Sequence, residues 1–396
     1  MSDELLAILT FRAGYNTAVV IAGVIALGAG GGVIGVLSFL RKRALISDAI
    51  SHATLPGIAL GFIISVALGG TGRELPVLMT GAAATGALGI LCVQWIRDNT
   101  RLPEDAAIGT VLSVFFGLGI VLLSHIQTME TGGQAGLNSF LLGSTAALTA
   151  GEAQLIGVAS LVAIGCAALL LKEFGALAFD EGFSKALGWN VARLDLAMLG
   201  LLLAIVAIGL KTVGLILIIA IVIIPPAAAR FWTERLGRMA ALSGLIGALS
   251  GWIGGAASAL FPKLPAGAVI VLTAAAFFVA SLLFAPRRGV IAGAVRLLLQ
   301  RTSARSTEAL IAAAEGRVPV GTGRVLARIR SHLDAAGRLT ETGRAAAAEA
   351  LRQRELWRRF LRAHPEETLA FRPLSGGRIE DALPADLVRA LERAAP

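Results

Sequence analysis

Cysteine and charged residues are scarce in this chain of 396 residues. The two cysteines, Cys92 and Cys166, both lie inside apolar segments, so we expect neither a disulfide framework nor a zinc–thiolate cluster. Charged residues make up 15% of the chain, against about 25% in an average soluble domain. Hydrophobic residues make up 56%, and the mean hydropathy is +0.78. This composition predicts that most of the chain lies in a lipid bilayer.

Motifs of nucleotide-binding and hydrolytic proteins are also missing. Residues 209–212 lack the glycines of a P-loop, so we expect no ATP binding through that motif. Residues 30–35 formally match G-x-G-x-x-G, but they lie in an apolar segment with no preceding strand, which indicates helix packing. Neither H-E-x-x-H nor G-x-S-x-G occurs, so nothing in the sequence favours hydrolase chemistry.

Nine apolar segments have roughly the 17–25 residues that cross a bilayer. These predicted spans are 17–40, 44–69, 75–96, 106–127, 153–171, 194–210, 213–229, 240–260 and 266–285. Only Lys211 and Thr212 separate the sixth span from the seventh, so these two form either a broken hairpin or a pair of partial helices. The first four residues lack the basic region of a secretory signal peptide, and we expect the first span to be retained.

The distribution of Lys and Arg predicts the orientation of the spans. With nine spans, alternate connections share one side with the C-terminus, and that side carries thirteen Lys and Arg residues against four on the other. Basic residues are enriched in cytoplasmic connections. We therefore expect the N-terminus outside and the C-terminus in the cytoplasm.

The C-terminal part of the chain differs in charge from the rest. Residues 287–396 carry a net charge of +8, with arginine as their only basic residue, whereas residues 1–286 carry +1. We predict a transmembrane domain over 1–286, a linker over 287–304 and a cytoplasmic domain over 305–396. Apolar residues of the last domain recur at helical spacing, and Thr340 is a candidate helix N-cap.

Asp48 and His52 lie four residues apart in the second predicted span, where ionisable groups are costly and are functional-site candidates by default. At this spacing they share one face of a helix. A carboxylate and an imidazole together offer one hard and one borderline ligand to a divalent metal ion. The alternative is a structural dyad that is buried and paired internally. His125, near the end of the fourth span, is a candidate entry ligand, with an interfacial residue as its alternative.

The longest polar connection between spans is 172–193, on the predicted cytoplasmic side. Asp180 and Glu181 suit the start of a short helix, because acidic side chains favour the positive end of the helix dipole. Gly188 suits its end. A short helix between two spans offers a handle by which a motor protein moves the membrane domain, and a solvated loop is the alternative.

Five blocks of the sequence resemble, in order and at similar spacing, the manganese/zinc/iron permease family of binding-protein-dependent ABC importers. The blocks are 45–59, 101–109, 179–188, 223–230 and, more weakly, 264–268. The resemblance implies an all-α polytopic fold similar to that of the vitamin B12 importer. It also implies a dimer of permeases, identical or different, that receives metal from an extracytoplasmic solute-binding protein and is driven by a separate ABC ATPase subunit.

The same resemblance implies roles for individual residues. Asp48 and His52 match the pair that lines the ion path in this family, and two subunits would supply four such ligands. The segment that matches the ATPase coupling loop includes Phe179, Asp180, Glu181, Ala186 and Gly188.

The C-terminal part resembles a second family, the diphtheria-toxin-repressor-like metalloregulators, over about residues 305–393. The likeness is carried by residues 337–344, 354–361 and 378–384. It implies a small, mainly helical winged-helix domain, but Arg354 and Asp381 stand where that family has metal-binding histidines, although Glu380 remains. The basic charge suits nucleic acid, the anionic inner leaflet or a docking ATPase. We favour an accessory regulatory or assembly domain and do not expect nucleic-acid binding.

The leading hypothesis is a permease subunit of an ABC importer for manganese, zinc or iron in the bacterial cytoplasmic membrane. It would have no cofactor of its own, with ATP bound by the partner subunit. A membrane-tethered metal-responsive regulator and a secondary transporter working alone are the alternatives, and neither needs a handle for an ATPase. All three metals accept carboxylate and imidazole ligands, so the three stay open.

Overall fold

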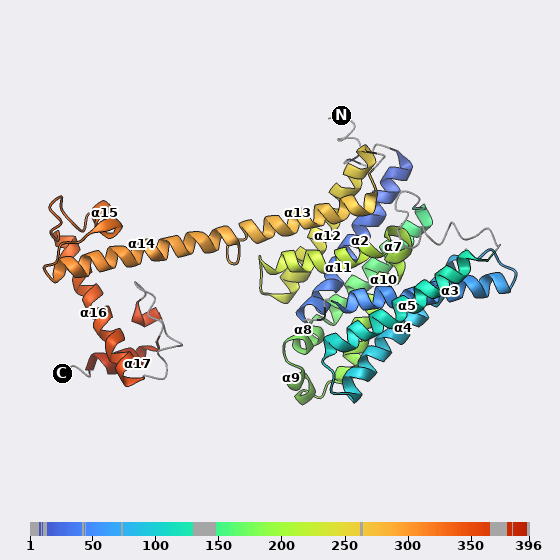
Figure 1. Ribbon diagram of the computed structural model, residues 1–396, viewed down its shortest axis with the longest axis horizontal. Helices are drawn as coiled ribbons and strands as arrows, with labels where there is room; N and C mark the ends of the chain where they lie inside the picture. Colours follow the sequence, from blue (N-terminus) through green and yellow to red (C-terminus); the bar gives the residue numbers. More distant parts are fainter. Residues whose placement is uncertain are drawn as a thin grey trace. The chain divides into compact units, whose positions relative to one another are not determined.

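The computed structural model describes residues 8, 10, 14–41, 43, 45–72, 74–129, 148–261, 264–364, 378–381 and 383–393. The chain divides into two compact units, a membrane unit (Met1–Gly289) and a C-terminal unit (Val290–Pro396). The described residues form helices and contain no β-strand, only one isolated β-bridge (Figure 1). The predicted all-α class is therefore confirmed for this part of the chain.

Eight helices in the described part of the membrane unit are long and apolar enough to cross a bilayer. They are α2 (Tyr15–Leu40), α3 (Ile46–Ala67), α4 (Leu75–Asn99), α5 (Glu104–Gln127), α7 (Ala150–Leu169), α10 (Val191–Val213), α12 (Leu236–Leu260) and α13 (Ala266–Phe284). Each of them corresponds to a predicted span. The remaining predicted span, 213–229, is α11 (Leu215–Arg230), whose 16 residues make it shorter than these eight.

The break between α10 and α11 lies at a glycine. Gly214 has a φ of +81°, a conformation that glycine adopts without steric cost. Lys211 and Thr212, which the sequence suggested as the break, belong to the last turn of α10. A polar pair thus interrupts the apolar pattern without ending the helix.

The connection 172–193 contains two helices, α8 (Leu171–Phe179) and α9 (Glu181–Ala186), where one short helix was predicted. The buried residues of α8, such as Phe174, continue the apolar pattern of α7 after a single intervening residue. The apolar pattern of the sequence therefore did not indicate where α7 ends and α8 begins.

Glycines set the closest helix contacts of the membrane unit. A Cβ on Gly28 would lie 2.2 Å from the carbonyl oxygen of Gly247, and a Cβ on Gly247 would lie 2.1 Å from that of Gly28. The helices α2 and α12 therefore pack backbone to backbone, as small residues permit in membranes. Gly32 and Gly35 also lie against backbone carbonyls, those of α12 and α11. The G-x-G-x-x-G match is thus a packing feature, as predicted.

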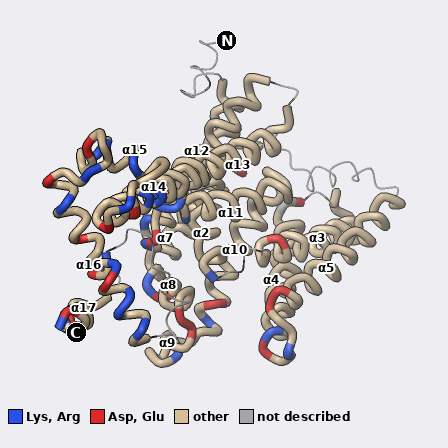
Figure 2. The backbone as a smooth tube through the Cα atoms, turned by 60° about the vertical axis from the view of Figure 1, so that its left-hand side comes forward, with Lys and Arg blue, Asp and Glu red and all other residues tan. Residues whose placement is uncertain are grey.

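The helix α10 lies between two groups of helices. One group has α2 packed against α7, α11 and α12, the other has α3 packed against α4 and α5, and α10 contacts both. Its buried residues, among them Leu199, Leu202 and Val206, belong to the main hydrophobic core. Charged residues of the membrane unit gather at helix ends near α4, α8 and α9 (Figure 2). A polar residue at the start of α10, near α8 and α9, can therefore contact residues of several helices.

The C-terminal unit consists of α14 (Val290–Ala314), α15 (Gly321–Ile329), α16 (Glu341–Ala363), a 3-10 turn (Ile379–Asp381) and α17 (Ala385–Arg393). Residues 290–304, predicted as a linker, form the first part of α14. Thr340 caps α16, because its hydroxyl accepts a hydrogen bond from the backbone nitrogen of Gly343 at 3.0 Å. Leu333 and Leu339 form the isolated bridge. The described residues contain no paired strands that would form a wing.

Candidate metal site

The start of α3 positions the two candidate metal ligands. The helix begins at Ile46, and Asp48 lies in its first turn, where the helix dipole favours a carboxylate. On the buried face, the hydroxyls of Ser51 and Thr54 donate to backbone carbonyls at 2.7 and 2.6 Å. These buried polar groups are satisfied within the helix itself. Asp48 and His52 lie on a more open face.

The structure brings Asp48 and His52 together. His52 Nε2 lies 3.2 Å from Asp48 Oδ1, and the two side chains are 18% and 31% exposed, respectively. The imidazole also contacts the ring of Phe116 on α5 edge-on, with centroids 4.7 Å apart and an interplanar angle of 75°. His52 Nδ1 is buried without a hydrogen-bond partner among the described residues. The two side chains are thus partly exposed, and His52 Nε2 and Asp48 Oδ1 face each other.

The described part of one chain supplies too few ligands for a closed transition-metal site. The described residues contain no group of three or more His, Cys, Asp and Glu side chains that could hold a metal ion. Closed protein sites for such ions commonly use four ligands. The oxygen and nitrogen donors of Asp48 and His52 suit manganese, zinc and ferrous iron, but a tight site needs further ligands from elsewhere.

His125 lies apart from this pair. It is exposed in the last turn of α5, and its carbonyl oxygen accepts hydrogen bonds from Thr128. Phe116, which contacts His52, is nine residues earlier on the same helix, a rise of about 14 Å. His125 therefore does not join Asp48 and His52 in one site, and a role at the entry stays a prediction.

The helix α9 has well-defined ends. Asp180 is its N-cap, and Asp180 Oδ1 accepts a hydrogen bond from the backbone nitrogen of Phe183 at 2.9 Å. Gly188 follows the last turn with a φ of +80°. Lys185 lies 3.0 Å from Glu181, and this contact lowers the pKa of Glu181 below its usual value. The predicted start and end of the short helix are confirmed.

The region of α9 exposes apolar side chains. Phe179 is 66% exposed, and Phe183, Ala186 and Leu187 are also exposed. Ser184, by contrast, is fully buried. Exposed aromatic and aliphatic side chains outside the spans are a feature that protein-docking surfaces share.

A buried carboxylate near the start of α10, Asp195, was not among the residues predicted from the sequence. Asp195 is 1% exposed and accepts hydrogen bonds from Arg43 at 2.6 and 2.8 Å. Arg41 and Arg97 approach the same carboxylate to 3.3 and 3.2 Å. The sequence did contain a reason to single out Asp195, because it is an ionisable residue inside a predicted span. No local motif marked its partners, which lie on other elements.

Two of the three C-terminal residues that the sequence comparison with the regulator family singled out, Arg354 and Glu380, are engaged in ion pairs. Arg354 lies 3.2 Å from Glu315. Glu380 accepts hydrogen bonds from Gln353 and lies 2.5 Å from Arg352. Its own backbone N–H, Gln353 and Arg352 lower the pKa of Glu380. The side chain of Asp381 lies outside the described part of the chain.

Ionisable pairs on the spans of a polytopic helical protein are typical of membrane transport proteins. The model of one family, the ABC 3 transport family, matches residues 15–285. The chain belongs to this family, which consists of ABC transporter permeases. The match lies within the membrane unit.

Known proteins resemble the chain over most of its length. The manganese transport system membrane protein MntC of Bacillus subtilis is 41% identical over 75% of this chain and 67% of that protein. The zinc transport system membrane protein TroC of Treponema pallidum is 36% identical over 72% of this chain and 94% of that protein. The solved structure of PsaBC from Streptococcus pneumoniae in complex with Fab has a chain with 29% identity and a TM-score of 0.61, covering 73% of this chain and 98% of that chain.

Proposed function

We infer that the membrane unit is the permease subunit of an ABC importer that takes up the divalent transition metals manganese, zinc or iron across the bacterial cytoplasmic membrane. The observation that carries this function is the Asp48–His52 pair on α3 in a chain of the ABC 3 transport family. The relatives named for manganese and zinc transport support the same class of substrate.

Two copies of the pair, one from each of two permease subunits, form the metal path. Four oxygen and nitrogen ligands bind a divalent ion, and the lack of thiolates and the partial exposure of Asp48 and His52 keep the ion exchangeable. A transport site must admit its ion and also release it. His125 acts at the extracytoplasmic entry. It lies in the last turn of α5, beyond Phe116, which contacts His52, and that end of α5 is the extracytoplasmic end in the proposed orientation.

The remaining partners follow from the orientation of the spans. The bias of Lys and Arg supports an external N-terminus and a cytoplasmic C-terminus, with nine spans in which α11 is the shortest. The exposed apolar side chains around α9 then dock on a separate ATPase subunit in the cytoplasm. A solute-binding protein delivers the metal on the opposite side.

The C-terminal unit is a cytoplasmic accessory domain that regulates or assembles the importer. We propose that this domain covers 305–396, after a membrane domain over 1–286; the likeness of its sequence to the winged-helix regulators supports a regulatory role. The ion pairs of Arg354 and Glu380 argue against metal sensing through that family's ligand positions.

The test is uptake of manganese, zinc and iron by cells that express the permease with its ATPase and binding protein. We expect Asp48→Asn and His52→Gln each to lower uptake at least about tenfold, as loss of a metal ligand or its support typically does. Both variants should still associate with the ATPase subunit. Normal uptake in both would contradict the site assignment.

A matched control tests whether the loss of uptake is specific to the Asp48–His52 pair or follows the loss of any carboxylate. Asp105 is an exposed carboxylate in the first turn of α5, and Asp105→Asn should leave uptake unchanged. Removal of the ATPase subunit should abolish uptake by the wild-type protein. Uptake that persists without the ATPase would favour a secondary transporter, and no metal uptake at all would favour a regulator.

A further inference from the structure

A cluster of six charged residues, the Asp195 cluster, joins the helix ends of the membrane unit near α9. Its members are Arg41, Arg43, Arg97, Glu104, Glu181 and Asp195. They come from the α2–α3 connection, the last turn of α4, the start of α5, and α9 and α10. Asp195 stands at its centre, because the guanidinium groups of all three arginines contact its carboxylate.

The cleft beside this cluster is not a site for a free anion. It has a volume of about 400 Å³ and is lined by the three arginines. Each arginine already has at least two carboxylate partners: Arg43 pairs with Glu104 and Asp195, Arg41 with Glu181 and Asp195. Buried charges that are paired in this way hold each other and do not call for a further ligand.

Arg41 connects the cluster to the helices α8 and α9. Its Nη1 donates to the carbonyl oxygen of Leu177 in α8 at 2.9 Å, and its Nη2 lies 3.6 Å from Glu181 in α9. The same Nη2 lies 3.3 Å from Asp195. One side chain therefore touches α8, α9 and α10.

Arg43 connects the cluster to α3. Its backbone nitrogen donates to the carbonyl oxygen of Ser38 in α2 at 2.9 Å, and its own carbonyl oxygen accepts from Ile46, the first residue of α3, at 3.0 Å. Its guanidinium is bound to Asp195 by two hydrogen bonds. Asp48 lies only two residues beyond Ile46. A shift of Arg43 therefore acts directly on the turn that carries Asp48.

We propose that Arg41, Asp195 and Arg43 form a rigid link that passes movement of α9 to the start of α3, and so positions the Asp48–His52 pair during each ATP cycle. This inference rests on the proposed function. The link resists stretching, because separating Asp195 from its arginines would leave an uncompensated charge in a buried environment. The three residues are positioning residues, since they act on the metal pair through α3.

The test uses the complete transporter, with permease, ATPase and binding protein, in liposomes with Mn²⁺ as the probe. Manganese uptake and ATP hydrolysis are measured on the same vesicles, and the readout is Mn²⁺ transported per ATP hydrolysed. Arg41→Gln removes the contacts to Leu177, Glu181 and Asp195 but leaves the pair between Arg43 and Asp195. We expect the ratio to fall at least about fivefold, the size of a typical coupling between sites, while ATP hydrolysis stays within about twofold.

Arg193→Gln is the matched control. Arg193 is an exposed arginine two residues before Asp195 on α10, outside the cluster, and its removal should leave the ratio unchanged. In Arg41→Gln, an unchanged ratio, or an equal fall in uptake and hydrolysis, would overturn the link, because a merely structural role moves both activities together.

A second variant keeps the proposal testable if Arg41→Gln does not assemble. Glu181→Gln removes the end of the link at α9, together with the ion pair between Glu181 and Lys185. The side chain is 46% exposed, and the variant should lower the ratio about twofold. An unchanged ratio there would contradict the link. Failure of the proposed function is distinguishable, because the wild-type complex would then transport neither manganese nor zinc nor iron.

Discussion

The local surroundings of Asp48 and His52 bear on the choice between a metal path and a structural dyad. A dyad would be buried, with its polar atoms satisfied by hydrogen bonds. Asp48 is instead 31% exposed, and the buried Nδ1 of His52 has no partner among the described residues. The ring of Phe116 packs edge-on against the imidazole. The arrangement favours two ligands that are held in place and still accessible.

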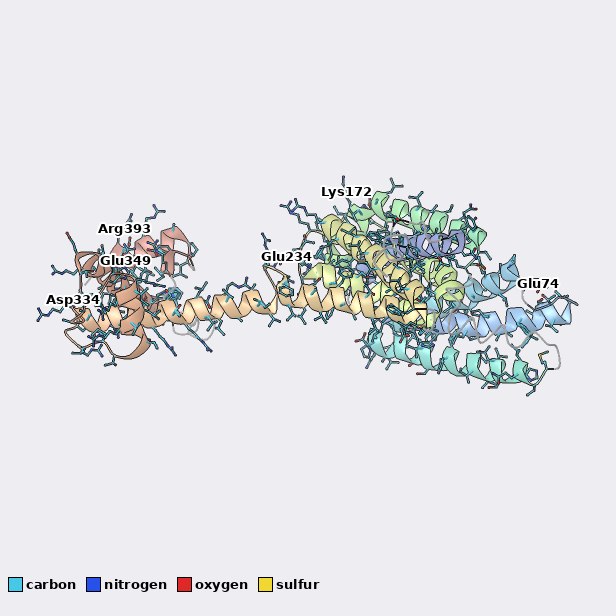
Figure 3. The ribbon with its side chains drawn as sticks, turned by 90° about the horizontal axis from the view of Figure 1, so that it is seen from above. Glu74, Lys172, Glu234, Asp334, Glu349 and Arg393 are labelled. Carbon is cyan, nitrogen blue, oxygen red and sulfur yellow. The ribbon has the colours of Figure 1, made fainter. Side chains whose placement is uncertain are left out.

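Glu74 lies at the connection between α3 and α4, and its protonation makes the local stability of this connection depend on pH (Figure 3). Hydrogen bonds from the hydroxyl of Ser65 and from Thr71 lower the pKa of Glu74 to about 2. A carboxyl with a lowered pKa stabilises the folded state above its unfolded pKa, about 4.3, and this contribution is lost as the pH falls towards the folded pKa. We expect hydrogen-exchange protection of the Thr71 amide to be constant above about pH 5 and to fall between about pH 4.3 and 2.

Glu74→Gln is the control for this titration. The variant should show weaker protection of Thr71 near neutral pH, because an amide oxygen accepts a weaker hydrogen bond than a carboxylate. It should also show no further loss over the acid range. Identical pH profiles for the two proteins would contradict the role of Glu74.

Contacts within one helix could be predicted from the sequence, whereas contacts between helices could not. Asp48 and His52 could be placed on one face because their spacing fixes it. Asp180 could be identified as a helix start because capping is a local interaction. Phe116 and Asp195 make their contacts across different helices, and no pattern along the sequence specifies which helices pack together. Those contacts required the structure.

At the scale of elements, the close packing of α3 against α4 holds the helix that carries the metal pair. A Cβ on Gly57 would lie 2.0 Å from the carbonyl oxygen of Gly81, and a Cβ on Gly81 would lie 2.2 Å from that of Gly57. Both contacts involve backbone atoms, which cannot rotate away. The two helices must therefore move apart if either glycine gains a side chain.

Gly57→Ala tests this packing. We expect a loss of about 1–3 kcal/mol in stability, the usual cost of overpacking, and a lower metal uptake, because α3 shifts with its ligands. Thermal unfolding in detergent and uptake in cells measure the two effects. Gly109→Ala on α5 is the matched control, since a Cβ there has no atom within 4 Å. Equal melting temperatures for the two variants would contradict the packing argument.

The lengths of elements were easier to predict than their ends. Long apolar runs marked the spans because a bilayer requires about 17–25 such residues. Polar residues lie close to the break at Gly214 and to the boundary between α7 and α8 without marking either. Lys211 and Thr212 still belong to α10, and Lys172 and Glu173 already belong to α8. Hydropathy alone could not locate them, because glycine also occurs inside the packed helices.

At the scale of the whole molecule, all parts of the proposed transport machinery lie in one unit. The metal pair, the exposed surface around α9 and the Asp195 cluster belong to the membrane unit. The C-terminal unit has hydrophobic clusters of its own, one around Leu310 and one around Phe360. Its fold therefore does not depend on completing the core of the membrane unit.

Deletion of Val290–Pro396 tests this independence. If the C-terminal unit regulates the importer, the chain ended at Gly289 should insert and transport Mn²⁺ within about twofold of the full-length rate, because a unit with its own core folds alone. Uptake in cells, divided by the amount of permease in the membrane, measures the effect. Asp48→Asn in the shortened chain should abolish the remaining uptake, which excludes a background pathway. Loss of uptake at a normal amount of shortened permease would show that the C-terminal unit is part of the transport machinery.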